Sequence, residues 1–508
     1  MRAMAEVVRE VERKYVAPGG VGVPDFAGMS GGVRVEAGKT VELDAMYFDT
    51  PGLALAARGI TLRRRTGGAD AGWHLKLPAG VDARDEVRVP LGASEREVPA
   101  ELAVRIRAYT RDGEPVPTVR LRTVREVRLV RAGGPTLAEI AHDAVTAEVF
   151  AGSGVTTMSW TEVEVELVEG EPGLLDVLDR RLVKGGWRRA ETASKLGHAL
   201  AEAGRRAERR VAKPRAGSAG ALALDYVLEQ VDTLLAYDPR VRLDEPDAVH
   251  KMRVATRRLR SAFRVFSKVL DERVTGILGA ELKWLAAELG RVRDQEVLVE
   301  RLRERIAALP AEAVLGPVEA RLTAWDARRT AEARTRVLSE LDGARYFALL
   351  DALDTLVARP PFTARAGQPA RRPAAAALRR SDRRISRRAR VALRSPAGRA
   401  RDTALHEVRK AAKRVRYAGE ATRPALGKPA KQLTTRAKEM QELLGTHQDS
   451  VQTRKALRRL AIAAHAAGES AFTWGLLYGE EVVFAQRVET EFPSHWHDFA
   501  RPRLRRGL

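Results

Sequence analysis

Two short segments in the first 200 residues carry acidic side chains at every second position. The first, "EVERKY", places Glu10, Glu12 and Lys14 on one face if it is a β-strand, because strand side chains alternate between faces. The second, "TEVEVEL", does the same with Glu162, Glu164 and Glu166. Carboxylate oxygens are the ligands that Mg²⁺ and Mn²⁺ prefer, so the glutamates of both triplets are candidate metal ligands.

Cationic side chains occur in the strand-like segments between these triplets. They are Arg63 and Arg65 in "LRRR", Lys76 in "HLKL", and Arg122 and Arg125 in "LRTVR". Arginine grips a phosphate with a two-pronged fork, and lysine acts as a point charge. If carboxylates and cations share the interior of a closed sheet, a metal between them would polarise a phosphoryl group and orient an attacking water.

The alternative is a set of solvent-facing strands whose opposite charges pair across the sheet, which is common in antiparallel sheets. The recurrence of same-face triplets at both ends of one region, together with several cationic strands, favours a site.

The hydrophobic pattern divides the chain into two domains. Up to about residue 200, short alternating segments separated by Gly, Pro and Asp predict antiparallel strands. From about residue 219 the apolar period becomes helical. We therefore predict an α+β protein, with a β domain at 1–205, a linker at 206–218 and an all-α domain at 219–505.

The predicted α domain contains an internal repeat, at about 219–360 and 375–500. "VHKMRVATRRLRSAF" and "LHEVRKAAKRVRYAG" are each followed by a Leu-Gly…Asp element, "LGRVRD" ending at Asp294 and "LGTHQD" ending at Asp449. On a helix, one face of the first segment carries His250, Arg253, Arg257, Arg260 and Arg264. The second segment repeats the offsets with His406, Arg409, Lys413 and Arg416.

Stacked like charges destabilise a helix by roughly 0.2–0.5 kcal/mol per pair. Their repetition at the same spacing indicates an anion that offsets the repulsion. The alternatives are a solvated basic face, structural histidines, and aspartates that cap helices or pair with the arginines. Residues 371–402 carry arginines at i, i+4 and i+8, which predicts either a third basic helix or a partly disordered arm.

The first domain resembles the CYTH superfamily, the triphosphate tunnel metalloenzymes. The resemblance rests on "EVERKY", "YFDTPGLALAARGITLRRR", "WHLKLP", "RDEVR", "LRTVR", "LAEIAHDAV", "WTEVEVEL" and "ASKLG", in that order over about residues 4–204. It implies a closed, eight-stranded antiparallel β-tunnel that binds a triphosphate with one or two divalent ions, Mg²⁺ or Mn²⁺. The Gly-rich stretch 16–40 and the irregular "RAYTRDGEPVPTVR" depart from the family pattern.

The resemblance also implies roles for individual residues. Glu10, Glu12, Glu164 and Glu166 would hold metal, with Glu162, Glu86 and Asp143 as further matches of less defined role. Lys14, Arg63, Arg65, Lys76, Arg122, Arg125 and Lys195 would hold phosphate. Among these, Glu10, Glu12 and Lys14 are the expected catalytic residues.

The second domain is similar to the CHAD domain, a duplicated helical domain often found behind CYTH. The similarity implies that inorganic polyphosphate binds along a basic groove, through phosphate contacts. The expected contacts are His250, Arg253, Arg257, Arg258, Arg260, His406, Arg409, Lys410, Lys413, Arg414 and Arg416.

Composition agrees with a polyanionic partner. Lys plus Arg total 89 against 67 Asp plus Glu, a net charge of +22, while only 5% of residues are aromatic. Few stacking platforms make nucleic acid a less favoured partner than polyphosphate. With no signal-peptide pattern and no long apolar segment, we expect no membrane partner and a cytoplasmic protein, at polyphosphate granules or free.

The leading hypothesis is a metal-dependent hydrolase of inorganic triphosphate, or of a related triphosphate, whose helical domain binds polyphosphate. Adenylate cyclase and thiamine triphosphatase activities are enzymatic alternatives. A non-enzymatic polyanion-binding scaffold is the alternative from another class.

Overall fold

A computed structural model describes residues 6–16, 33–80, 82–152 and 154–501. The chain divides into two compact units, Met1–Arg209 and Arg210–Leu508. Most of the Gly-rich stretch and the last residues of the predicted helical domain lie outside the described residues. Within those residues, every helix is too short or too polar to cross a membrane.

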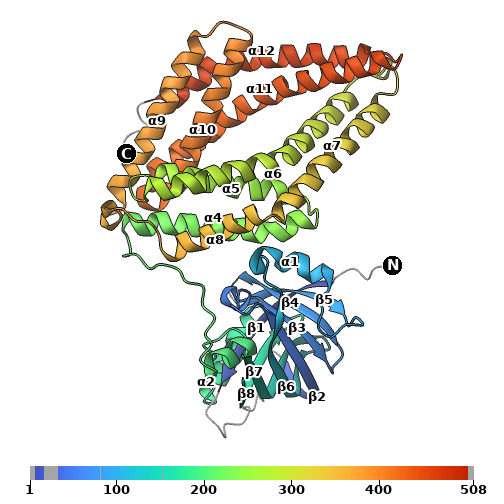
Figure 1. Ribbon diagram of the computed structural model, residues 1–508, viewed down its shortest axis with the longest axis vertical. Helices are drawn as coiled ribbons and strands as arrows, with labels where there is room; N and C mark the ends of the chain where they lie inside the picture. Colours follow the sequence, from blue (N-terminus) through green and yellow to red (C-terminus); the bar gives the residue numbers. More distant parts are fainter. Residues whose placement is uncertain (1–5, 17–32, 81, 153, 502–508) are drawn as a thin grey trace. The chain divides into compact units, whose positions relative to one another are not determined.

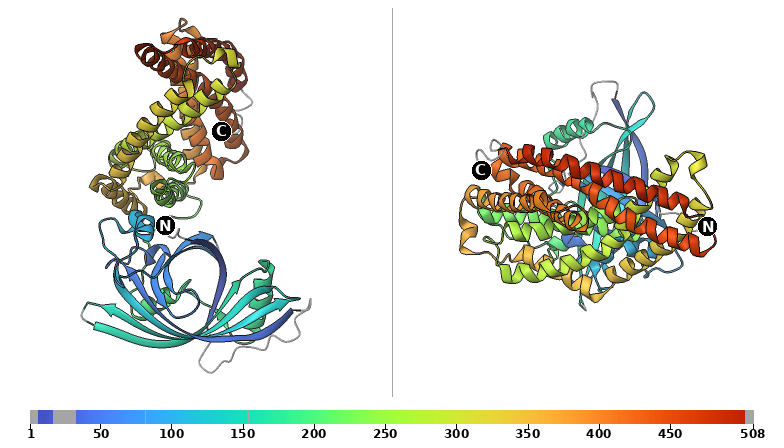
Figure 2. Two further views of the ribbon diagram at one scale, coloured as in Figure 1. Left: turned by 90° about the vertical axis from the view of Figure 1, so that its right-hand side faces the viewer. Right: turned by 90° about the horizontal axis from the view of Figure 1, so that it is seen from above.

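The first unit is an antiparallel sheet that closes on itself. Its strands are β1 (Glu6–Val16), β2 (Val33–Asp49), β3 (Thr61–Thr66), β4 (Gly72–Gly80), β5 (Ala83–Pro90), β6 (Val116–Ala132), β7 (Thr136–Ala151), β8 (Gly154–Leu167) and β9 (Arg188–Arg189). Eight of them follow the order β5-β4-β3-β2-β6-β7-β8-β1, and β5 pairs with β1 to complete the ring (Figure 2, left). The short β9 is added to β1. The predicted α+β fold with an eight-stranded closed sheet is confirmed.

Alternating side chains give this ring an apolar outside and a charged inside. On the outside, Val163 and Val165 of β8 are buried against helix α2 (Gly173–Lys184). Leu62 and Leu75 of β3 and β4 are buried with residues of helix α1 (Ala100–Thr110) in the same way. Residues of opposite parity on the same strands therefore point inward, as the period of two requires.

A third helix, α3 (Lys195–Glu202), packs against inward-facing side chains. Leu196 and Leu200 form one hydrophobic cluster with Leu121 and Val145, which share strand faces with Arg125 and Asp143. The side chain of Ser194 caps this helix by accepting a hydrogen bond from the Gly197 backbone N–H. The helix thus fills part of the interior and fixes the position of its first residue, Lys195.

The second unit is all-helical. Its helices are α4 (Ala219–Arg242), α5 (Ala248–Val265), α6 (Glu272–Ala307), α7 (Val318–Leu341), α8 (Ala344–Ala358), α9 (Arg371–Arg394), α10 (Arg399–Leu426), α11 (Lys428–Ala466) and α12 (Phe472–Ala500). Figure 1 shows α6 with α7 and α11 with α12 as two long pairs of neighbouring helices. The repeated motifs lie on α5–α6 and on α10–α11.

Of the two alternatives for residues 371–402, the structure shows the helical one. Helix α9 buries Ala374, Leu378, Ile385 and Ala389 along one side, so its arginines lie on the other. These apolar residues recur at intervals of four and seven, which is the pattern of a helix packed on one face.

Candidate functional site

Strand register places opposite charges directly across from one another inside the ring. Lys14 lies opposite Glu164 between β1 and β8, and Lys76 lies opposite Glu86 between β4 and β5. Directly opposite residues of an antiparallel pair share a face. The pairing of charges across strands, which the surface alternative required, therefore does occur, but in the interior of the closed sheet.

These side chains line a cavity of about 390 Å³ inside the ring. Ten of the predicted site residues lie on its wall: Glu10, Glu12, Lys14, Arg63, Arg65, Lys76, Arg125, Glu164, Glu166 and Lys195. Glu86, matched only through the family resemblance, lies there too. With Glu86 included, these carboxylates and cations come from six strands and one helix and line the same cavity.

At one end of the cavity Lys195 holds three carboxylates together. Its Nζ lies 2.8 Å from Asp143 Oδ2, 2.9 Å from Glu162 Oε1 and 2.5 Å from Glu164 Oε1. Burial lowers the pKa of the ammonium, but the three carboxylates outweigh burial and raise the pKa above its usual value. Glu162 and Asp143 lie behind Lys195 rather than on the cavity wall, and their oxygens are close enough to Glu164 to share a cation.

Elsewhere on the wall several carboxylates lie close to one another. Glu12 and Glu166 lie opposite each other on β1 and β8. Burial raises the pKa of Glu166 to about 7, with help from the negative charges of Glu10, Glu12 and Glu164. Among the described residues, no cation is within ion-pair distance of Glu166. A set of buried carboxylates that repel one another fits a hard divalent cation, because such an ion binds oxygen ligands and offsets the repulsion.

The cations also lie close to carboxylates. Lys76 Nζ is 2.5 Å from Glu10 Oε2, and the Arg125 guanidinium contacts Asp143 with two N–H groups, at 2.8 and 2.7 Å. Arg63 donates to the Tyr47 hydroxyl at 3.3 Å. A hydrogen-bonded pair of this kind holds each cation in place, so the wall is organised before any anion binds.

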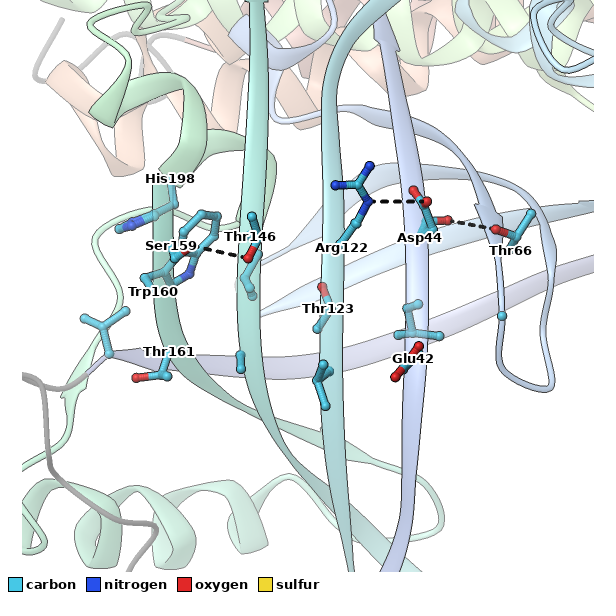
Figure 3. Close-up of a pocket in the computed structure, with 16 residues that line it drawn as sticks. Glu42, Asp44, Thr66, Arg122, Thr123, Thr146, Ser159, Trp160, Thr161 and His198 are labelled. Carbon is cyan, nitrogen blue, oxygen red and sulfur yellow. Dashed lines mark hydrogen bonds and ion pairs between the residues drawn. The ribbon is translucent and has the colours of Figure 1, made fainter. Parts of the chain in front are cut away.

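The structure corrects the placement of Arg122. Arg122 is three residues from Arg125 on β6, so the two side chains point to opposite faces of the sheet. Its guanidinium lies 3.0 Å from Glu148 Oε1 and 3.9 Å from Asp44 Oδ2, and its side chain is 51% exposed. Figure 3 shows it beside Asp44 in a second pocket, and it is not among the residues that line the charged cavity. The structure therefore does not bring Arg122 together with the other predicted phosphate-binding cations of the tunnel.

Several cavity residues were not predicted as site residues from the sequence. They are Tyr47, Arg84, Arg88 and Glu139 on the wall, and His74, which lies 2.9 Å from Glu86 behind it. Arg84 and Arg88 alternate with Glu86, so that spacing was a usable signal. Glu139 faces the cavity because it pairs with Glu166, and this register cannot be read from a single strand.

In the helical unit, α5 and α10 bring four predicted cations together. Burial, together with the nearby charges of Arg257, Arg409 and Arg253, lowers the pKa of Lys413 to about 6. Burial and Arg257 lower the pKa of Arg409 in the same way. We call Arg253, Arg257, Arg409 and Lys413 the basic cluster.

The glycines of the Leu-Gly…Asp elements leave room for the side chains of two of these arginines. A Cβ on Gly290 would lie 3.2 Å from Arg253 Nε, and one on Gly445 would lie 3.4 Å from an Arg409 nitrogen. One turn further along α6, Asp294 forms an ion pair with Arg253 at 3.2 Å. Asp449 interacts electrostatically with Arg409. The aspartates therefore lie within helices and face arginines, and they do not cap helix ends.

The other predicted polyphosphate contacts surround this cluster or lie apart from it. Burial lowers the pKa of His250 and of His406, helped by Arg293 and Lys410 respectively. Arg260 and Arg414 lie near Arg264 and Arg384, a second group of cations that includes helix α9. Three predicted contacts have carboxylate partners of their own: Arg258 and Arg416 share Glu420, and Lys410 pairs with Glu407.

A closed β-tunnel lined with carboxylates and cations, followed by a duplicated basic helical unit, defines a class of protein. The CYTH domain model matches residues 8–184, and the CHAD domain model matches residues 225–458. The chain belongs to the family of proteins that join a CYTH domain to a CHAD domain.

Relatives over the full length support this assignment. The chain is 42% identical over 498 residues to the uncharacterized protein Rv2226 of Mycobacterium tuberculosis, covering 96% of this chain and 95% of the relative. Among solved structures, the CHAD domain from the plant Ricinus communis is 22% identical and covers 57% of this chain and 95% of its own, with a TM-score of 0.45. PptA from Streptomyces chartreusis is 20% identical and covers 55% of this chain and 99% of its own, with the same TM-score.

Proposed function

We propose that this protein is a metal-dependent triphosphatase. Its tunnel hydrolyses inorganic triphosphate, or a related triphosphate, with Mg²⁺ or Mn²⁺. The observation that carries this proposal is the cavity itself, where six glutamates and eight cations line one space inside the closed sheet.

The ion pairs of the cavity suggest how substrate enters. Each pair would exchange partners: the carboxylates would pass to a divalent ion, and the cations would pass to phosphate oxygens. Such an exchange keeps every buried charge compensated, which matters because an unpaired buried charge is costly. A divalent ion held by Glu10, Glu12, Glu164 and Glu166 would offset phosphate charge and activate water for attack.

The cations would position the substrate. Arg63, Arg65 and Arg125 offer planar forks to phosphoryl oxygens, while Lys14, Lys76 and Lys195 add point charges. Arg65 is distinctive, because burial and the charge of Arg63 lower its pKa to about 9. An anion at this point would relieve the repulsion between the two arginines.

The deciding experiment compares two glutamine variants on the full chain. Glu12→Gln removes a carboxylate inside the tunnel and is expected to lower phosphate release from inorganic triphosphate by about 100-fold or more. Glu126→Gln makes the same chemical change on an exposed position of β6 and is expected to leave the rate unchanged. Turnover that survives Glu12→Gln would contradict the tunnel mechanism.

The same assay separates the enzymatic alternatives. ATP and thiamine triphosphate are tested beside inorganic triphosphate, with phosphate and cyclic AMP as readouts. A non-enzymatic scaffold predicts no metal-dependent turnover of any of them.

We further propose that the helical unit binds inorganic polyphosphate and keeps the protein at polyphosphate in the cytoplasm. The basic cluster supports this, because it gathers cations whose pKa values are lowered by burial and by neighbouring cations. Changing Arg253 and Arg409 together to Gln is expected to weaken polyphosphate binding by at least tenfold and to reduce its salt dependence. DNA that competes equally with polyphosphate at matched salt would instead favour a general polyanion site.

A further inference from the structure

The helical unit contains a buried histidine between two carboxylates. His447 of α11 is 1% exposed, and its Nε2 has no hydrogen-bond partner among the described residues. Nε2 lies 3.3 Å from Asp402 Oδ1 on α10 and 3.5 Å from Glu489 Oε1 on α12. Neither oxygen is aligned for a hydrogen bond, although both are near.

The two carboxylates are oriented so that one oxygen of each faces the histidine. Arg454 contacts the other oxygen of Asp402, Oδ2, at 3.5 Å, and Arg401 contacts the other oxygen of Glu489, Oε2, at 3.8 Å. This is the arrangement of a metal centre whose ligands are held by outer partners. The inner atoms Oδ1, Oε1 and Nε2 lie within 4.8 Å of one another.

We infer that Asp402, His447 and Glu489 form a binding site for a divalent transition-metal ion of the Zn²⁺ or Mn²⁺ type. Ligands on tetrahedral Zn²⁺, at bond lengths of about 2.0–2.1 Å, are separated from one another by about 3.3–3.4 Å, which the two measured separations match. One imidazole nitrogen with two carboxylate oxygens suits such an ion better than Mg²⁺ or Ca²⁺, which take oxygen ligands alone.

The internal repeat argues that this site is more than packing. The residue of the first repeat that corresponds to His447 is Val292, two positions before Asp294 as His447 is before Asp449. Val292 is also buried. An apolar side chain therefore fills the corresponding position in the first repeat, and of the two repeats only the second has a metal-binding residue type there, His447. The metal would join α10, α11 and α12.

The site is tested by Zn²⁺ binding to the full chain in a large excess of Mg²⁺, which occupies hard oxygen sites such as those of the tunnel. We compare wild type with His447→Gln, and with His465→Gln as a control on an exposed position of the same helix. His447→Gln is expected to lose one bound Zn²⁺, or to bind it more than about 100-fold more weakly, since losing even an outer partner costs about 10- to 100-fold. His465→Gln is expected to match wild type.

A second measurement needs no variant. Zn²⁺ is expected to slow hydrogen exchange in the wild-type segments around Asp402, His447 and Glu489, where the metal would join three helices. Equal Zn²⁺ binding by wild type and a folded His447→Gln would overturn the inference. If that variant does not fold, the absence of Zn²⁺-dependent protection in wild type would overturn it instead.

Discussion

The tunnel and the basic cluster both gather buried cations, but they treat the charges in opposite ways. In the tunnel, carboxylates outweigh burial and raise the pKa values of Lys14, Arg125 and Lys195. Arg65 is the exception, because burial and Arg63 lower its pKa. In the basic cluster, burial and neighbouring cations lower the pKa values of Arg409 and Lys413. One region is compensated by its own residues, whereas in the other Asp294 and Asp449 compensate only part of the positive charge.

Under the proposed function, this difference would correspond to two kinds of binding. A compensated site can hold its geometry while empty and exchange its ion pairs for a metal and a phosphate chain. An uncompensated site stores repulsion that a long polyanion relieves, at a cost in stability before the anion arrives. A catalytic pocket requires the first arrangement, and a tether for polyphosphate can use the second.

The largest expected effect comes from replacing one buried lysine with methionine in each region. Lys195→Met would leave three buried carboxylates without their shared cation and is expected to destabilise the β unit by about 3–5 kcal/mol. Lys413→Met would remove a buried amine from among arginines and is expected to stabilise the helical unit by about 1 kcal/mol or more. Hydrogen exchange in denaturant, followed by mass spectrometry, reports the stability of each unit within the full chain.

The pH dependence of the Lys413→Met effect has a definite sign. An unfolded lysine binds its proton below about pH 10.5, whereas folded Lys413 has a pKa of about 6. The wild-type helical unit therefore loses stability as the pH falls from about 10 to 6, and the gain from Lys413→Met grows over the same window. A destabilising Lys413→Met at pH 7 would show that the comparison between the two regions is wrong.

The next effect is on polyphosphate affinity. Because bound phosphate favours the charged amine, binding is expected to take up one proton at Lys413 above pH 6. Affinity should then fall by up to about tenfold per pH unit between pH 7 and 9. Lys413→Arg introduces the residue that the first repeat has at this offset, Arg257, and is expected to flatten the dependence. Titrations with long-chain polyphosphate at constant ionic strength measure both proteins.

The sequence predicted much of the tunnel but little of its detail. Alternation alone placed Glu10, Glu12 and Lys14 together on one inward face, because side-chain direction in a strand is fixed by parity. The same rule puts Arg122 and Arg125 on opposite faces of β6, because they are three residues apart. The family resemblance had assigned both residues to phosphate. The pairing of Glu139 with Glu166 depends on register between strands, which no single segment encodes.

In the helical unit, the periodicity located the basic faces but not their neighbours. The offsets from His250 and His406 identified the arginines that meet, yet Arg258 and Arg416 prove to share Glu420 across two helices. The glycines of the Leu-Gly…Asp elements had no assigned purpose in the sequence. Their role depends on the packing of α5 on α6 and of α10 on α11, which only the structure supplies.

The smallest expected effect comes from replacing those glycines. It tests whether the positions of Arg253 and Arg409 in the basic cluster matter for polyphosphate binding. Gly290→Ala would place a Cβ 3.2 Å from Arg253 Nε and shift the guanidinium, so polyphosphate binding is expected to weaken a few-fold. Gly445→Ala has slightly more room beside Arg409 and is expected to weaken it less. Both changes should still raise helix stability by up to about 1 kcal/mol, because glycine is a poor residue in a helix interior.

The matched control is Gly279→Ala, also within α6, where a Cβ meets nothing within 4 Å. It should give the gain in stability without any loss of binding. Thermal unfolding and polyphosphate titration of the three variants separate the two quantities. If Gly290→Ala and Gly279→Ala bound polyphosphate equally, the seat that Gly290 offers to Arg253 would have no part in binding, and the basic cluster would act through its net charge alone.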